Sequence, residues 1–311
     1  MMNFKTSSGK RWAVVLSGGD GERMRAFVRK RLGRSRPKQY CAFTGRRTML
    51  EHTLDRAVAA AGPSRVVTVI NPDHRIFLER PRRLNVPGCL IVQPRRCDTG
   101  PGVFLPLTVV AARDPEAVVA VMPSDHFIHP KERFQAALDE AFGFAERHHE
   151  RIVLLAARPD SAEPDYGWIT PGARVSGSRA FLVDSFKEKP GPEEAAALHR
   201  RGGLWNTMLV VARATALWEA AREFLPAMLA RFALLRTHLG TPAESQALEL
   251  AYRSMPCVNF SRDILEHAAA RTVVLPLRGV NWSDWGRPQR VLRTLEEIGA
   301  AAARQEAAHV S

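Results

Sequence analysis

The sequence has no long apolar segment and few cysteines, and both shortages exclude classes of protein. No apolar run reaches the roughly 18 residues that a membrane-spanning helix needs. The four cysteines (Cys41, Cys89, Cys97 and Cys257) form no C-x-x-C pair, so neither a disulfide framework nor a zinc site is indicated. The first residues, MMNFKTSSGKRW, lack the apolar core of a secretory signal. We therefore expect a cytoplasmic protein with no membrane partner.

Acidic residues are also scarce relative to basic ones. Lys and Arg number 45 against 32 Asp and Glu, which gives a net charge of +13. Such an excess indicates an anionic partner, for which nucleic acid, a lipid surface and a polyphosphate are the candidates. Eight of the sixteen residues from Arg23 to Lys38 are basic and none is acidic. A general preference for arginine explains part of the total charge, but it explains this cluster less well.

Apolar segments of strand length recur along the chain, with helical patterns between them. We predict strands at 11–17, 65–70, 89–93, 117–122 and 151–156, and a helix at 49–61. Nearly continuous apolar strands that alternate with helices indicate an α/β fold whose sheet is mostly parallel and is covered by helices on both faces. Ligands of such a sheet bind at the carboxyl ends of its strands.

The pattern changes after the predicted fifth strand. Short strands and turns fill about 159–213, and a mainly helical region, a strand-like run and a final helix at 287–304 follow. The sequence contains no internal repeat and no low-complexity linker. We therefore predict one unit in three parts: a core at about 11–158, a β-rich lobe at about 159–213, and a helical and C-terminal region at about 214–311.

A glycine-rich loop follows the first predicted strand in the segment WAVVLSGGDGERMR. Gly18, Gly19 and Gly21 allow backbone N–H groups to face a phosphate. The loop matches neither the P-loop pattern nor G-x-G-x-x-G, so a flexible turn is the alternative interpretation. The segment RPKQY supports the phosphate interpretation, because its Lys38 is a compact cation suited to a phosphate oxygen.

Two carboxylates within the same loop oppose that interpretation. Asp20 and Glu22 should repel a polyphosphate. Either their side chains point away from the phosphates, or Asp20 shares a bound metal ion. In both cases we expect the arginine-rich continuation of the loop to offset their charge.

Two further aspartates follow apolar strand-like runs. Asp125 occurs in VMPSDHFI and Asp284 in NWSDWG. A carboxylate at the end of a buried strand needs a partner, and a hard cation such as Mg²⁺ is a natural one. Helix capping and turn formation are the commoner uses of aspartate and stay open for both residues. We expect His126 to be a structural hydrogen-bonding group.

Polar pairs in the β-rich region form a third group. Tyr166-Gly167, Glu188-Lys189-Pro190 and Trp205-Asn206 occur in this order. Glu and Asn side chains bind sugar hydroxyls, and Lys binds phosphate. Trp205 is expected in the core, which is the usual location of tryptophan.

Seven motifs in order carry a resemblance to a known family: LSGGDGER with RPKQY, TMLEHTLDRA, PSDHFI, YGWI, FKEKP, LWNTM and WSDWG. Together they resemble the sugar-1-phosphate nucleotidyltransferases, and most of all the mannose-1-phosphate guanylyltransferases. The resemblance extends from about Trp12 to Gly286. It implies a Rossmann-like core with a mixed, mostly parallel sheet and a β-rich sugar-binding lobe.

The resemblance also implies roles for individual residues. It implies nucleotide binding by Leu16, Ser17, Gly18, Gly19, Gly21, Arg23, Lys38 and Ser124. It implies sugar-phosphate binding by Gly167, Glu188, Lys189 and Asn206. It implies a catalytic set of Arg23, Lys38, Asp125, Lys189 and Asp284, with Mg²⁺ on the two aspartates. The implied substrates are an NTP, here GTP, and a hexose 1-phosphate, here mannose 1-phosphate, and a homodimer stays open.

The chain departs from the family pattern in two segments. Asp20 and Glu22 replace the Ser and Thr of the family loop GGSGTR. In QPRRCDTGPG, which corresponds to the family's EPxxRNTAPA, the substituted residues are Gln93, Cys97 and Asp98. The second segment bears on selectivity for guanine.

Other functions therefore stay as alternatives. The same fold with another base or sugar, such as a glucose- or heptose-phosphate enzyme, is one. A catalytically silent sugar-nucleotide sensor is another, although the presence of both aspartates and both lysines argues against it. Nucleic acid is not expected as a partner, because no helix-turn-helix, zinc finger or RNA-binding aromatic motif accompanies the basic cluster.

Overall fold

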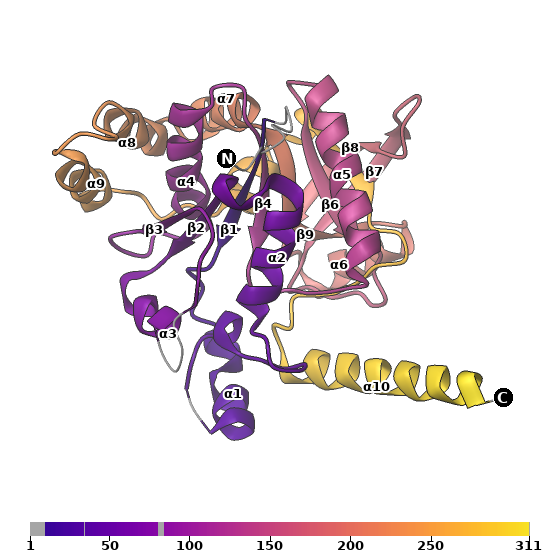
Figure 1. Ribbon diagram of the computed structural model, residues 1–311. Coiled ribbons are helices and arrows are strands. Elements are labelled where there is room, and N and C mark those ends of the chain that lie inside the picture. The colour runs from indigo at the N-terminus through magenta and orange to yellow at the C-terminus, as the bar shows by residue number, and fades with distance from the viewer. Residues whose placement is uncertain (1–9, 34, 80–83, 311) are drawn as a thin grey trace, which may run out of the picture.

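A nine-stranded mixed sheet forms the centre of the protein, and helices cover both of its faces (Figure 1). The structure is a computed structural model that describes the backbone of residues 10–33, 35–79 and 84–310 and the side chains as far as residue 299. Within these ranges, every helix is too short or too polar to cross a membrane.

The strands are β1 (Arg11–Leu16), β2 (Val66–Ile70), β3 (Cys89–Val92), β4 (Val118–Pro123), β5 (Phe127–His129), β6 (Ile152–Ala157), β7 (Gly167–Arg174), β8 (Phe181–Glu188), β9 (Leu204–Arg213), β10 (Thr272–Pro276) and β11 (Asn281–Ser283). The helices are α1 (Arg25–Leu32), α2 (Met49–Ala61), α3 (Arg75–Glu79), α4 (Thr99–Arg113), α5 (Lys131–Arg147), α6 (Pro192–Arg200), α7 (Ala214–Phe224), α8 (Pro226–Arg236), α9 (Glu244–Arg253) and α10 (Pro288–Val310).

The order of the large sheet is β3-β2-β1-β4-β9-β6-β10-β8-β7. The pairings of β1 with β2 and β4, of β2 with β3, and of β6 with β10 are parallel. β9 runs antiparallel to both β4 and β6, and β8 runs antiparallel to both β10 and β7. All strands of this sheet except β8 and β9 therefore point in one direction, which confirms the mixed, mostly parallel sheet.

Two apolar cores lie on opposite faces of the sheet. α2 and α5 cover one face, where Leu50 and Phe134 are buried. α4 and α7 cover the other, where Phe104 and Leu217 are buried, with α8 and α9 packed outside them. The central strands are apolar on both sides because both of their faces are covered.

Strand pairing brings distant loops together at the carboxyl edge of the sheet. β1 and β4 are neighbours, and the Ser124 N–H donates to the Leu16 carbonyl at 3.0 Å. The small antiparallel pair β5–β11 places Phe127 opposite Ser283. The residues that follow β1, precede β5 and follow β11 thus meet in one region.

The predicted β-rich segment contributes strands to the same sheet. β7 and β8 form a hairpin that extends the sheet beyond β10, and β9 lies between β4 and β6. The pairing of β9 with β6 shifts register between Leu155 and Ala156, because β9 bulges at Thr207 and Met208. The division of the chain into core, lobe and helical region stays a prediction.

Candidate active site

The loop after β1 borders a pocket of about 390 Å³ at the carboxyl edge of the sheet. Among the predicted site residues, those that line the pocket are Leu16, Gly18, Gly19, Ser124 and Asp125. A side chain at Gly18 would meet the amide of Gln93, since an added Cβ would lie 3.1 Å from its Nε2 atom. The glycine therefore keeps this part of the pocket open.

Ser17 and Gly21 lie behind the pocket and shape the loop. The Ser17 carbonyl accepts a hydrogen bond from Gln39 Nε2 at 3.2 Å and lies 3.0 Å from Nδ1 of His74. Gly21 has a φ of 59°, a left-handed conformation that favours glycine. An added Cβ at Gly21 would also lie 3.3 Å from the backbone nitrogen of Lys38, so the loop passes close to the RPKQY segment.

Lys38 joins the two predicted metal-binding aspartates. Its side chain is only 5% exposed, and its Nζ atom lies 3.1 Å from Oδ2 of Asp125. The same ammonium group donates to the backbone carbonyl of Asp284. The structure thus brings the two aspartates and the lysine together from three separate loops.

Both carboxylates are stabilised in their charged form. Burial alone would raise the pKa of Asp125, but the Lys38 ammonium and then His126 together outweigh this effect and lower it. Burial likewise opposes ionisation of Asp284, yet Lys38 and then Arg290 lower its pKa well below the usual range. Both side chains are therefore ionised at neutral pH.

Asp284 is held in a fixed orientation by three donors to its Oδ1 atom. The Tyr166 hydroxyl donates at 2.7 Å, the Gly286 N–H at 2.9 Å and Arg290 at 2.6 Å. Arg290 also pairs with Glu163 at 2.6 Å and lies over the Tyr166 ring. The carboxylate is thus positioned by the hairpin and by α10 together.

Arg23 lies at the edge of this cluster, since an added Cβ at Gly286 would lie 3.2 Å from its Nη2 atom. Its side chain is exposed, and it pairs with Asp165 at 3.2 Å. It is not among the described residues that line the pocket. Its predicted contact with a triphosphate stays a prediction.

Three of the four predicted sugar-phosphate residues lie together. Gly167 pairs with Glu188 across the β7–β8 hairpin, and an added Cβ at Gly167 would lie 2.7 Å from Oε2 of Glu188 and 3.2 Å from Cβ of Asn206. Asn206 is fixed by a hydrogen bond to Ser261 at 3.3 Å. Burial raises the pKa of Glu188, against the opposing effect of Lys189.

Lys189 begins the turn that follows β8. Its φ of 48° is left-handed, and its backbone N–H donates to the Tyr166 carbonyl at 3.2 Å. Its side chain is exposed. A conformation that is rare for a non-glycine residue is consistent with a constraint at this position, whose role stays a prediction.

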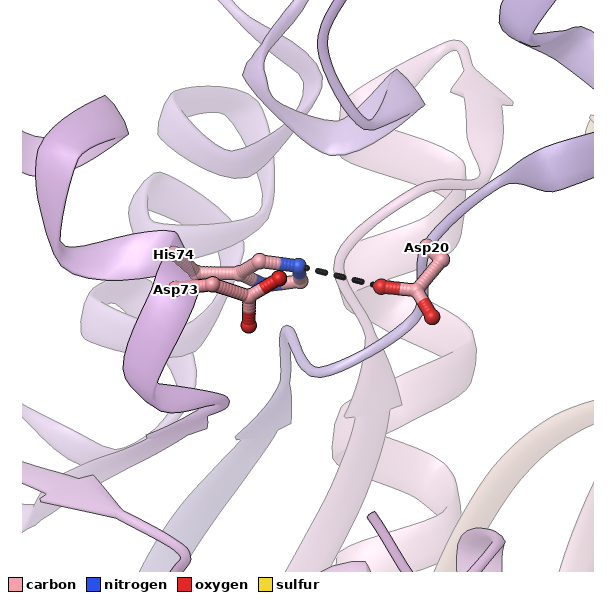
Figure 2. A group of neighbouring side chains, drawn as sticks. All are labelled: Asp20, Asp73 and His74. Atoms are coloured by element: carbon pink, nitrogen blue, oxygen red, sulfur yellow. Dashed lines mark ion pairs between the residues drawn. The ribbon is translucent and has the colours of Figure 1, made fainter. Parts of the chain in front are cut away.

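Figure 2 shows the carboxylate of Asp20 directed toward His74 and Asp73. Ligand atoms of these three residues lie within 4.8 Å of one another. Arg96 pairs with Asp20 and, at 2.6 Å, with Asp73. An arginine side chain therefore already compensates one of the two negative charges of this cluster.

The prediction that the arginine-rich continuation of the loop offsets the charge of Asp20 was wrong. The arginine-rich continuation forms α1, where Arg25, Arg29 and Arg31 are exposed. The cation that contacts Asp20 is Arg96, from the loop between β3 and α4. Pairing through the fold, and not proximity in the sequence, provides the compensation.

The residues that depart from the family pattern lie around the same pocket. Gln93 is buried, donates to Asn71 at 2.6 Å and accepts from the Tyr252 hydroxyl at 3.3 Å. Asp98 caps α4 by accepting from the Thr99 N–H at 2.6 Å. Gln93, Cys97 and Asp98 all line the pocket.

Several residues of the site were not predicted from the sequence. Arg290 and Arg96 are two arginines among many, and Gln39 was noted only as part of RPKQY. One available signal was the burial expected for Asp284, which requires a cationic partner. His126 accepts a hydrogen bond from the Trp282 ring at 3.3 Å, and Trp205 is buried beside Tyr166, as predicted.

The fold and the loops that converge on the pocket are those of a nucleotide-binding α/β protein. The family model described as nucleotidyl transferase matches residues 12–299. The chain therefore belongs to the nucleotidyl transferase family.

Two curated relatives show which members of this family the chain resembles. The xanthan biosynthesis protein XanB of Xanthomonas campestris is 29% identical over 92% of this chain and 60% of that protein. A mannose-1-phosphate guanylyltransferase of Escherichia coli is 29% identical over 96% of this chain and 62% of that protein. The chain thus spans about 60% of the length of these curated relatives.

A solved structure agrees with these relatives. The crystal structure described as mannose-1-phosphate geranyltransferase from Thermus thermophilus superposes with a TM-score of 0.75 at 28% identity, over 89% of this chain and 76% of that one. The predicted resemblance to the sugar-1-phosphate nucleotidyltransferases and the predicted fold class are confirmed.

The raised pKa of Glu188 predicts a dependence of stability on pH. A group whose pKa is raised by folding stabilises the protein fully below its unfolded value, and that contribution is lost as pH rises through the folded value. We expect Glu188→Gln to increase the free energy of unfolding relative to wild type at about pH 8 but not at about pH 4. Urea unfolding across this range measures the difference.

Glu249→Gln is the matched control, because Glu249 is exposed on α9. Its stability profile should run parallel to that of the wild type. A Glu188→Gln profile that is also parallel to the wild type would contradict the cost of burying this carboxylate.

Proposed function

We propose that the chain is a sugar-1-phosphate nucleotidyltransferase that converts GTP and mannose 1-phosphate to GDP-mannose and pyrophosphate. The proposal rests on the contacts of Lys38 with Asp125 and Asp284, which bring the three residues together beside the pocket of the glycine loop. Family membership and the names of the relatives support the choice of reaction and substrates.

Both proposed substrates are anions, so charge neutralisation and positioning dominate the catalysis. In the proposed reaction an oxygen of the sugar phosphate attacks the α-phosphorus of the NTP, and pyrophosphate leaves from the opposite side. Arg23 and Lys38 hold the leaving pyrophosphate, and Lys189 holds the attacking phosphate. No serine, cysteine or histidine nucleophile is required.

The donor set fits the proposed Mg²⁺ cofactor. Asp125 and Asp284 offer ionised carboxylate oxygens, which are the ligands that this ion prefers. Lys38 and Arg290 together face three carboxylates, those of Asp125, Asp284 and Glu163, so a net attraction for a cation is left. When bound, a divalent cation supplies charge that reduces the repulsion between the substrates and polarises the reacting phosphorus.

Neighbouring groups hold the carboxylate of Asp284 in a fixed position. Tyr166, Arg290 and the Gly286 N–H all contact Oδ1 of Asp284, so its orientation is set before any ligand arrives. On the sugar side, the carboxylate of Glu188 and the side chain of Asn206 flank Gly167, and both residue types suit hydroxyl groups.

A second candidate is the same reaction with another base. Gln93 lines the pocket where the family motif has glutamate. An amide offers both a donor and an acceptor, whereas a carboxylate only accepts, so the two suit different base edges. Substrate selection therefore has to be measured.

A substrate screen tests both candidates. Purified protein with Mg²⁺ is incubated with each of the four NTPs and with mannose or glucose 1-phosphate, and pyrophosphate release is measured. We expect the fastest release with GTP and mannose 1-phosphate, and none when the sugar phosphate is omitted. Faster release with another NTP would favour the second candidate, and no release with any pair would contradict the function.

The pairing of Asp20 with Arg96 predicts an effect on nucleotide affinity. Asp20→Ser removes one of the two carboxylates that neutralise Arg96 at the edge of the pocket. One added positive charge is worth on the order of 1 kcal/mol toward an anion, so we expect GTP to bind about fivefold more tightly. Isothermal titration at fixed salt and Mg²⁺ measures the affinity.

The double variant Asp20→Ser/Arg96→Gln is the matched control, and it should lose the gain. Weaker binding by Asp20→Ser alone would contradict this account and would indicate that Asp20 itself helps to bind the nucleotide.

A further inference from the structure

A second pocket lies behind the segment that carries Asp125. It has a volume of about 800 Å³ and lies between α2, α5 and β5. Its apolar wall includes Phe43, Met49, Phe127, Ile128, Ala136 and Trp285. His126 is the one described residue that lines both this pocket and the pocket of the glycine loop.

Most charged side chains of the second pocket are already paired. Arg47 pairs with Asp55 at 2.9 Å, and Asp139 accepts from Arg11 at 3.2 Å. Lys131 lies 3.8 Å from its neighbour Glu132. These pairs leave little net charge on the rim.

Arg56 differs from these residues. Its guanidinium donates to Thr53 Oγ1 at 2.7 Å and lies 5.9 Å from the centre of the Phe134 ring. Among the residues that the structure describes, no carboxylate lies within ion-pair distance of it. Burial lowers the pKa of Arg56 to about 10, with Asp55 opposing the shift, so the side chain is still charged at neutral pH.

A half-buried cation beside an apolar wall selects one kind of ligand. A single negative group would compensate the charge of Arg56, which is only partly exposed to water. The aromatic and aliphatic side chains around it favour an apolar body on the same ligand. A polyanion such as a triphosphate is disfavoured, because the rim carries little net charge to compensate its additional negative charges.

The pocket also contacts both aspartate segments. His126 directly follows Asp125, and Trp285 directly follows Asp284. The rings of Phe127 and Trp285 stack with their centres 5.0 Å apart. Trp285 has a left-handed φ of 46°, which is rare for a bulky residue and shows that its surroundings hold it in place.

We propose that this second pocket binds an amphipathic monoanion, with its acidic group on Arg56 and its apolar body against Phe127 and Trp285, and that its occupancy alters the site at Asp125 and Asp284. The effect on catalysis rests on the proposed function, whereas binding and its effect on the two segments do not. The pocket is thus a regulatory site for a small acid.

The fluorescent monoanion 1-anilinonaphthalene-8-sulfonate is the probe for the binding step. We expect saturable binding by the folded protein, and at least about tenfold weaker binding by Arg56→Gln because the ion pair with Arg56 is lost. Ala136→Trp, at an exposed lining position, should block the pocket and abolish the binding. Arg133→Gln, on α5 but outside the lining, is the matched control and should bind as the wild type does.

Hydrogen exchange tests the effect on the two segments without requiring activity. The probe should change exchange in 125–129 and 281–286 of the wild type but not of Ala136→Trp. Pyrophosphate release should change at least twofold with the same pattern.

The outcomes separate the two proposals. If both Arg56→Gln and Ala136→Trp bind the probe with wild-type affinity, the probe does not bind in this pocket and the proposal is wrong. If hydrogen exchange in 125–129 and 281–286 is unchanged at saturating probe, the proposed effect on the two aspartate segments is wrong. A protein that binds the probe through Arg56 but releases no pyrophosphate would overturn only the proposed function.

Discussion

The contact of Lys38 with Asp125 and with the Asp284 backbone is the interaction on which the site depends. It joins loops whose contact residues are 246 positions apart in the chain. A nearly buried ammonium needs compensation, and ionised Asp125 and the carbonyl of Asp284 provide it. Burial by itself would raise the pKa of both carboxylates, and Lys38 acts against this shift and favours their ionised form. The three side chains therefore keep their charges when buried because the assembled loops bring them together.

Local charge matching recurs at the edge of the sheet. Arg290 compensates Asp284, and Arg96 compensates Asp20. The exposed cations of α1 contribute to the net charge of +13 without contacting these carboxylates. The glycine loop can therefore contain an aspartate and still border a pocket suited to a polyphosphate. Arg56, in the second pocket, has no carboxylate within ion-pair distance among the described residues.

The sequence predicted the elements that have a strong local pattern. The helix at 49–61 was correct at both ends, and the strand predicted at 117–122 shifted by only one residue, because continuous apolar burial marks its course. Contacts across the fold were not predictable in this way. Arg96 and Arg290 look like any other arginine until β3, α10 and the sheet bring them to their partners. The bulge at Thr207 and Met208 contains no glycine, so the local sequence did not predict it.

Pyrophosphate release by Asp125→Asn and Asp284→Asn tests the central claim most directly. Each variant keeps its size but loses the negative charge that Lys38 and a divalent cation would share. The account predicts that each lowers turnover at least about a hundredfold with folding intact, because preorganised charge supplies most of the catalysis. Asp160→Asn, which removes an exposed carboxylate paired with Arg293, should leave the rate unchanged. Turnover near the wild-type rate in either active-site variant would contradict the account.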